Sequence, residues 1–307
     1  MTNPTFPQVR EGLPCRLTQK LPCLTWRSPR TAWGLLAGQV RSIDGYNPAD
    51  GAVRRILGGG VTTSLVLPGS ANTMGGEAFA IKHRGARVEE ARIADAPRYM
   101  KMACGENPKN VYGGSGKTPG SRMGSAWVMR EKFEAASKLV QQQDDWCAAP
   151  SEVARYPSEL SLDSLTALLR GSLVLHTHCY TVWDMEMMIR LATEFNFTIA
   201  AFHHAIEAWK MPTVLKEHDI VTATFADHWG FKHEAYDGTP YAPKIIVDNG
   251  ARLVLKSDHP VLPAETLMYE AAKAYGYGLD RLSAIRGTAA RAAHRQWGAA
   301  RLTHFWL

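Results

Sequence analysis

The sequence predicts an α/β protein built around a parallel β-sheet. Between residues 160 and 276, short apolar runs rich in β-branched residues alternate with segments whose apolar residues recur at helical spacing. The runs are apolar throughout, which is typical of strands buried on both faces. From His176 to Asp258, three strand-to-strand steps take about 27 residues each, a repeat that suits a doubly wound sheet or a (β/α)8 barrel equally well.

Each element follows from its local pattern. Helices are predicted at 47–60, 123–145, 164–170, 182–195, 211–218, 241–250 and 264–276. Apolar residues recur at helical spacing in 182–195, Asp163 caps 164–170, closing glycines end 47–60, 164–170 and 241–250, and 264–276 is rich in Ala, Leu and Glu. Strands are predicted at the apolar runs 60–69, 172–178, 198–204, 220–226 and 252–258. The stretch 103–122 is rich in Gly, Pro and Asn and predicts a loop, whereas residues 1–38 show no usable periodicity.

The composition is that of a globular protein. The 307 residues are 45% hydrophobic and 21% charged, a balance that argues against global disorder. No apolar stretch approaches the length that spans a bilayer, and the N-terminus lacks the apolar core of a secretory signal, so we expect a cytoplasmic protein with no membrane partner. Five scattered cysteines, an odd number, argue against a disulfide framework and fit a reducing compartment.

The positive charge is concentrated at the two ends of the chain. The net charge is +6, and residues 1–60 and 281–307 each carry a balance of +5, which leaves the middle at −4. A nucleic-acid-binding protein carries its positive charge on an ordered face, whereas here the predicted folded body is mildly acidic. We therefore expect a small-molecule substrate and no nucleic-acid partner; a homo-oligomer is compatible with the sequence.

Polar residues recur at the carboxyl ends of the predicted strands. The sequence HTH ends one strand at 176–178, HH ends the next at 203–204, and Asp258 and His259 end another. Ligands and catalytic groups gather at this edge in α/β folds. A single His at this edge is usually a structural residue. Polar residues at the ends of several successive strands are harder to explain in that way. Imidazole and carboxylate groups are ligands of Zn²⁺ and similar ions, so the pattern predicts a metal site.

Two other motifs are set aside. The segment GGSGKTPG at 113–120 lacks the first Gly of a phosphate-binding loop, because that position is Val111, and Pro119 follows Thr118. Cys179 follows His178, but neighbours on a strand point to opposite faces, so a buried Cys is favoured over a thiol nucleophile.

Five segments together resemble a known family. They are GGGVTTSLVLPGSANTMGGEAFAIK, MACGENPKNVYG, HTHCY, AAFHHAIEAWK and VLKSDHPV. In this order and spacing they resemble the imidazolonepropionase-like branch of the amidohydrolase superfamily, and within it fungal amidohydrolase-related proteins, some of which carry a carbohydrate esterase family 9 label. The resemblance runs from about Gly38 to Gly287, and it implies a TIM-like (β/α)8 barrel with a metal site at the strand ends.

The resemblance also implies a set of ligands. His176 matches the metal histidine of the fifth barrel strand, and His204, rather than His203, matches that of the sixth. Because neighbours on a strand face opposite ways, only one of His203 and His204 is expected to enter the barrel. Asp258 matches the catalytic aspartate of the eighth strand.

Further residues complete the expected site. Glu106 is the expected metal carboxylate, with Lys82 as the alternative, since some relatives use a carboxylated lysine. His178 and Lys232 are expected to contact substrate, and Glu234 to line the pocket, although a surface position suits Lys232 and Glu234 equally well.

The implied activity is hydrolysis of carbon–nitrogen bonds other than peptide bonds. A divalent metal, zinc in the first place and present as one or two ions, activates a water, and Asp258 passes the proton to the leaving nitrogen. A cyclic amide, an N-acetyl compound or a related substrate fits this chemistry.

Two departures qualify the resemblance. No His precedes His83, so the HxH pair of the first barrel strand is missing, and both ends differ from the family's β-sandwich. We therefore expect a barrel truncated at both ends: a basic segment at 1–38, the barrel at 39–286 and a basic tail at 287–307. The alternative function is that of a non-catalytic barrel remnant.

Overall fold

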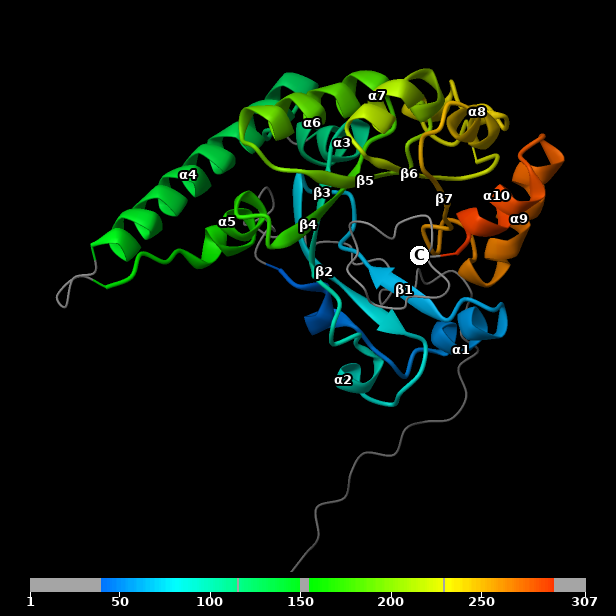
Figure 1. The fold of residues 1–307 in the computed structure, drawn as a ribbon, viewed down its shortest axis with the longest axis horizontal. Helices are drawn as coiled ribbons and strands as arrows, with labels where there is room; N and C mark the ends of the chain where they lie inside the picture. The colour runs from blue at the N-terminus through cyan, green and yellow to red at the C-terminus, as the bar shows by residue number, and fades with distance from the viewer. Residues whose placement is uncertain (1–39, 115, 150–154, 229, 290–307) are drawn as a thin grey trace, which may run out of the picture.

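The described part of the chain forms one curled sheet covered by helices. In the computed structural model it comprises residues 40–114, 116–149, 155–228 and 230–289. The strands lie side by side in chain order: β1 (Thr63–Val66), β2 (Met74–Lys82), β3 (Arg98–Ala103), β4 (Leu173–His178), β5 (Ile199–His203), β6 (Val221–Thr224) and β7 (Leu253–Leu255). Strands β3 to β7 are parallel, and β2 is antiparallel to β1 and β3. The predicted α/β class is confirmed, and the arc in Figure 1 agrees with part of a barrel.

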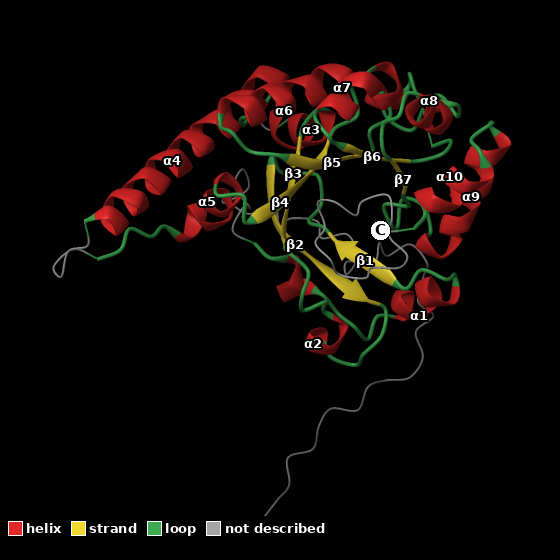
Figure 2. Cartoon of the chain, viewed as in Figure 1, coloured by secondary structure: helices red, strands yellow, loops and turns green. Residues whose placement is uncertain are grey.

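Helices lie on the outside of this arc (Figure 2). They are α1 (Gly51–Gly58), α2 (Val88–Ala91), α3 (Glu106–Gly113), α4 (Arg122–Ala148), α5 (Asp163–Leu169), α6 (Val182–Glu194), α7 (Pro212–Glu217), α8 (Ala242–Asp248), α9 (Leu267–Gly276) and α10 (Arg281–Gly287). All seven helices and all five strands predicted from the sequence are present, with ends that differ by a few residues.

Two strands and one helix next to the site were not predicted. Strand β2 is interrupted by a bulge between Met74 and Gly76, and β3 carries Lys101 within its apolar run, so neither shows a clean strand pattern. The stretch 103–122 was predicted to be a loop, which is wrong for its first half, because α3 begins at Glu106. Its Pro108 lies in the first helical turn, where the missing N–H costs no hydrogen bond.

The two faces of the sheet carry different side chains. On the outer face, residues such as Met100, Leu175 and Phe202 pack with the helices in the main hydrophobic core. On the inner face, Tyr99 and Val254 belong to a smaller apolar cluster. Toward the carboxyl ends of β3, β4 and β5, the residues on this inner face are polar. The strand register places Lys101, His176, His178 and His203 there. The alternation of the strands thus concentrates polar groups at one edge.

Several expectations concern residues beyond the described ranges. The basic segment predicted at 1–38 lies outside them, and so does the predicted tail 287–307 after Ala289. Among the described helices, none combines the length and the apolar character needed to cross a bilayer.

Candidate active site

Four histidines form a buried cluster at the carboxyl ends of β4 and β5. His176 Nδ1 lies 2.8 Å from His203 Nε2. The ring centroids of His178 and His204 are 4.7 Å apart, and those of His203 and His204 are 6.0 Å apart. Burial lowers the pKa of His176 to about 3 and holds the pKa values of the other three well below the usual value. The four imidazoles are therefore neutral at pH 7, the form that binds metals and acts as a base.

The expectation that only His204 enters the site is wrong. His178 pairs with His203 across the sheet, so His203 shares the face of the β4 histidines and contacts His176 itself. Strand β5 ends at His203, and His204 has a φ of 55°, so the alternation of side chains no longer applies to it. Both histidines consequently belong to the cluster.

Asp258 and Lys256 join the cluster through His204. His204 Nε2 lies 3.5 Å from Asp258 Oδ1. Lys256 Nζ donates to His204 Nδ1 at 3.0 Å and to Asp258 Oδ1 at 3.3 Å. Asp258 has a φ of 53°, so both His204 and Asp258 adopt the left-handed conformation that non-glycine residues rarely take. Such backbone conformations concentrate at functional sites, where the surrounding structure enforces them.

A second buried lysine, Lys101 of β3, stands on the same inner face beside His176. Burial lowers the pKa of Lys101 to about 7, although the charge of Asp258 acts in the opposite direction. Lys82, considered as an alternative metal-site residue, is elsewhere. Because β2 runs antiparallel, Lys82 pairs with Thr63 at the start of β1, and its ammonium donates to the Thr63 hydroxyl at 2.7 Å. Lys82 thus lies at the opposite edge of the sheet.

A hydrogen-bonded chain links α3 to His178. Lys232 Nζ donates to Asn107 Oδ1 at 2.6 Å and to the Tyr180 hydroxyl at 3.2 Å. The Asn107 oxygen therefore faces Lys232, and its Nδ2 donates to His178 Nε2 at 3.1 Å. This places the His178 proton on Nδ1, a buried atom with no hydrogen-bond partner among the described residues.

Glu106 is the first residue of α3, and a hydrogen bond from its backbone N–H fixes its position. Its N–H donates to Glu234 Oε2 at 2.8 Å, while its own Oε1 is buried and has no hydrogen-bond partner within the described ranges. The preceding Gly105 has a φ of 76°, and a Cβ there would collide with the Glu234 carboxylate. Glycine is thus required where the chain passes under Glu234.

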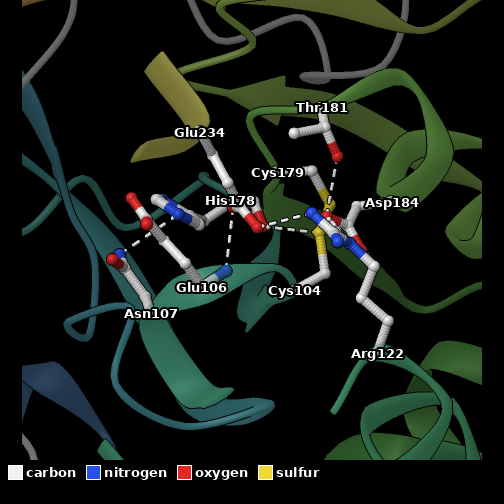
Figure 3. The surroundings of a disulfide bond; sticks show 9 residues. All are labelled: Cys104, Glu106, Asn107, Arg122, His178, Cys179, Thr181, Asp184 and Glu234. Atoms are coloured by element: carbon white, nitrogen blue, oxygen red, sulfur yellow. Dashed lines mark hydrogen bonds and ion pairs between the residues drawn. A yellow bond between two sulfur atoms is a disulfide. The ribbon is translucent and has the colours of Figure 1, made fainter. Parts of the chain in front are cut away.

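Arg122 ties Glu234 to the start of α6 (Figure 3). Its Nε donates to Asp184 Oδ2 at 3.0 Å and its Nη2 to Glu234 Oε1 at 2.6 Å. Asp184 also accepts from the Thr181 hydroxyl at 2.8 Å. Burial raises the pKa of Glu234, while the Arg122 guanidinium acts in the opposite direction. Glu234 is therefore part of the site's support, not a surface residue.

A disulfide joins Cys104, which precedes α3, to Cys179, which follows His178 (Figure 3). Both cysteines are fully buried, so the buried position expected for Cys179 is confirmed. The scattered cysteines argued against a disulfide framework, yet this pair is joined, because the parallel pairing of β3 with β4 brings the two residues after these strands together. Their Cα atoms are 5.3 Å apart, within the range that a disulfide spans.

The donor chemistry of the cluster fits a divalent ion such as zinc. Neutral imidazoles and two carboxylates are available, and Glu106 Oε1 lacks a partner within the described ranges. His204 Nε2 and Asp258 Oδ1 are 3.5 Å apart, close to the roughly 3.4 Å separation of two ligand atoms on one tetrahedral zinc. As the side chains now stand, no three His, Cys, Asp or Glu residues in the described ranges are placed to hold one ion.

Sequence reasoning missed the two buried lysines and Arg122. Lys101 and Lys256 each interrupt an apolar strand segment, MKMA and LVLKSD, and a charge in such a run indicates a buried group with a partner. Arg122 carried no such signal, because its partners, Asp184 and Glu234, lie 62 and 112 residues away in the chain.

Comparisons with known proteins identify two related amidohydrolases. No protein-family profile matches the chain. The chain is 44% identical over 266 residues to amidohydrolase tasK of Hapsidospora irregularis, in a match that covers 80% of this chain and 27% of that protein. The chain thus spans about a quarter of the length of that relative. The crystal structure of an amidohydrolase from Thermotoga maritima MSB8 is 33% identical with a TM-score of 0.79, and the match covers 84% of this chain and 67% of that one.

Proposed function

The chain belongs to the amidohydrolase family, and we propose that it hydrolyses amide-type carbon–nitrogen bonds of small molecules at the histidine cluster. The observation that carries this proposal is the convergence of neutral imidazoles with Asp258 at the carboxyl ends of β4, β5 and β7. Active sites of barrel enzymes occupy this edge. The five sequence motifs support the finer assignment to the imidazolonepropionase-like branch and the carbohydrate esterase 9 type.

A divalent ion, zinc in the first place, is part of this proposal. Glu106, His176 and His204 would hold it, and His203 is a further candidate because it contacts His176. Such an ion, when bound, lowers the pKa of a water and polarises a carbonyl. The protein's own contribution is a buried cluster of neutral imidazoles, which retain a lone pair for ligation because burial lowers their pKa values.

Asp258 is the proposed proton carrier. Its side chain is 32% exposed, whereas that of its neighbour His204 is 1% exposed, so water and substrate reach the carboxylate from outside. A carboxylate in this place takes the proton of the attacking water and delivers it to the leaving nitrogen. The left-handed backbone at Asp258 holds the carboxylate beside His204.

His178 is the proposed donor to the substrate carbonyl. The chain from Lys232 through Asn107 fixes the proton of His178 on Nδ1, and that N–H has no partner among the described residues. A preorganised N–H donor stabilises the negative charge that develops on a carbonyl oxygen during attack. Lys232 is the proposed contact for a polar substrate group, and it also holds Asn107 in place.

Hydrolysis assays with the purified full chain test the proposal. A panel of cyclic amides, N-acetyl amino sugars and N-acyl amino acids is incubated with zinc, and released amine and carboxylate are measured. We expect turnover of at least one class, with a loss of about 10²-fold or more in Asp258→Asn and none in the surface variant Asp248→Asn. Absence of turnover across the panel, or an unimpaired Asp258→Asn enzyme, contradicts the proposal and favours the non-catalytic alternative.

A further inference from the structure

Lys256 is a buried cation that contacts two residues of the proposed metal and proton-transfer site. Its side chain is 1% exposed. Its Nζ lies 3.0 Å from His204 Nδ1, 3.4 Å from His204 Nε2 and 3.3 Å from Asp258 Oδ1. An ammonium has three donors and no acceptor, so both partners offer it lone pairs. A neutral imidazole has one lone pair, so while His204 Nδ1 accepts from Lys256 its proton is on Nε2, the atom that a metal ion beside Asp258 would need.

The ammonium and an ion compete for one place. Bond lengths of about 2.0–2.2 Å to a nitrogen and an oxygen 3.5 Å apart fix the ion close to the line between them. Nζ is 3.4 Å from this nitrogen and 3.3 Å from this oxygen, so an ion bound to both atoms lies within about 4 Å of Nζ. Two positive charges at that separation repel strongly in a site that excludes water.

Lys101 increases the excess of positive charge. It is fully buried on the same face, and the charges of Asp258 and Lys256 both act on it. Lys256 and the protonated fraction of Lys101 thus face the Asp258 carboxylate, and the four imidazoles around them carry no charge to compensate. An additional divalent cation is disfavoured by this charge balance as well as by the position of Nζ.

We propose that Lys256 is a resident cation that holds His204 and Asp258 together and weakens the binding of a divalent metal to that pair by about tenfold or more. The inference rests on the proposed function, because that function assigns His204 to the metal and Asp258, beside it, to proton transfer. A metal that enters must displace the Lys256 ammonium from both partners, so the lysine sets the metal affinity of the site.

Metal binding to the full chain tests the inference without any substrate. Cobalt(II) and zinc are titrated by equilibrium dialysis into the wild-type protein, Lys256→Gln and Lys256→Met, and the cobalt absorption band reports on nitrogen ligands. Gln keeps a polar group and Met keeps the volume, so a folded variant is available if one of them fails to fold by circular dichroism. Lys244→Gln, on the surface helix α8, is the matched control.

We expect Lys256→Gln and Lys256→Met to bind cobalt about tenfold or more tightly than wild type, Lys244→Gln to match wild type, and His204→Ala to abolish the gain in the Lys256→Gln background. Equal affinity in wild type and both Lys256 variants overturns the inference but leaves the proposed metal site intact. Absence of binding in every protein overturns both the inference and the metal part of the proposed function. A gain that survives His204→Ala overturns the assignment of the pair.

Discussion

Replacing Arg122 with Met should strongly destabilise the protein, because it leaves two buried carboxylates without their cation. The side chains of Asp184 and Glu234 are only 1% and 8% exposed, whereas that of Arg122 is 41% exposed. Removing one partner of a buried ion pair costs about 3–5 kcal/mol. Because solvent partly screens the guanidinium, we expect the free energy of unfolding to fall by about 2–4 kcal/mol.

Urea denaturation followed by circular dichroism measures this loss. Lys138→Met is the control, since the Lys138–Glu134 pair on α4 has both side chains more than half exposed and should lose less than about 0.5 kcal/mol. Adding Glu234→Gln to Arg122→Met should cost less than the two single changes together, because a neutral amide needs no cation. If Arg122→Met loses no more free energy of unfolding than Lys138→Met, the two buried carboxylates do not depend on Arg122 for stability.

The pH dependence of the loss has a definite sign. Burial raises the pKa of Glu234 in the folded protein. A carboxyl group with a raised folded pKa contributes stability that is present below its unfolded value and is lost as pH rises through the folded value. Without Arg122 this pKa rises further, so the variant should be less impaired at pH 5 than at pH 7. A deficit that grows on acidification contradicts this cause.

Three further predictions concern the stability of the folded protein. Phe133→Ala should lower the free energy of unfolding by about 3–5 kcal/mol, measured by urea denaturation, because this fully buried ring stacks on Phe197 at 4.7 Å; a loss below 1 kcal/mol would contradict the packing. Cys104→Ser should cost up to about 4.5 kcal/mol by the chain-entropy relation for a separation of 75 residues, and thiol titration of the unfolded, unreduced wild type should find Cys104 and Cys179 unreactive. Burial lowers the pKa of His83 to about 4. The neutral His83 therefore contributes about 3 kcal/mol to the free energy of unfolding above pH 6.5, and this contribution should be lost as the pH falls toward 4. If His83→Asn shows the same dependence of stability on pH as wild type, this cause is wrong.

Local patterns were sufficient for much of the fold. The strands and helices from Leu173 to Gly276 carry clean apolar periodicity, and the structure places them as predicted. Strand β2 escaped prediction because its Glu77 is buried against Arg98 and Ser164, partners that only the tertiary structure supplies. Helix α3 escaped because Gly105 and Pro108 are read as loop residues unless the Glu234 carboxylate above them is known.

The candidate site was predictable in kind but not in detail. Histidines at successive strand ends indicated where polar chemistry gathers, and the family resemblance selected His176, His204 and Asp258. The side-chain contacts depend on where each strand ends. Because β5 stops at His203, alternation fails at His204. The register of β4 and β5 makes His203 the partner of His176. Lys256 lies only two residues before Asp258, yet its contact with His204 depends on the left-handed turns at His204 and Asp258.

Hydrolysis in ¹⁸O-labelled water tests most directly whether the cluster adds water across an amide bond. With any substrate that the zinc-supplied full chain turns over, we expect one labelled oxygen in the carboxylate product and an unlabelled amine. The rate of label incorporation should fall about 10²-fold or more in Asp258→Asn. Product formed without label, or label incorporated at the wild-type rate by Asp258→Asn, would show that the cluster does not hydrolyse the amide bond through Asp258.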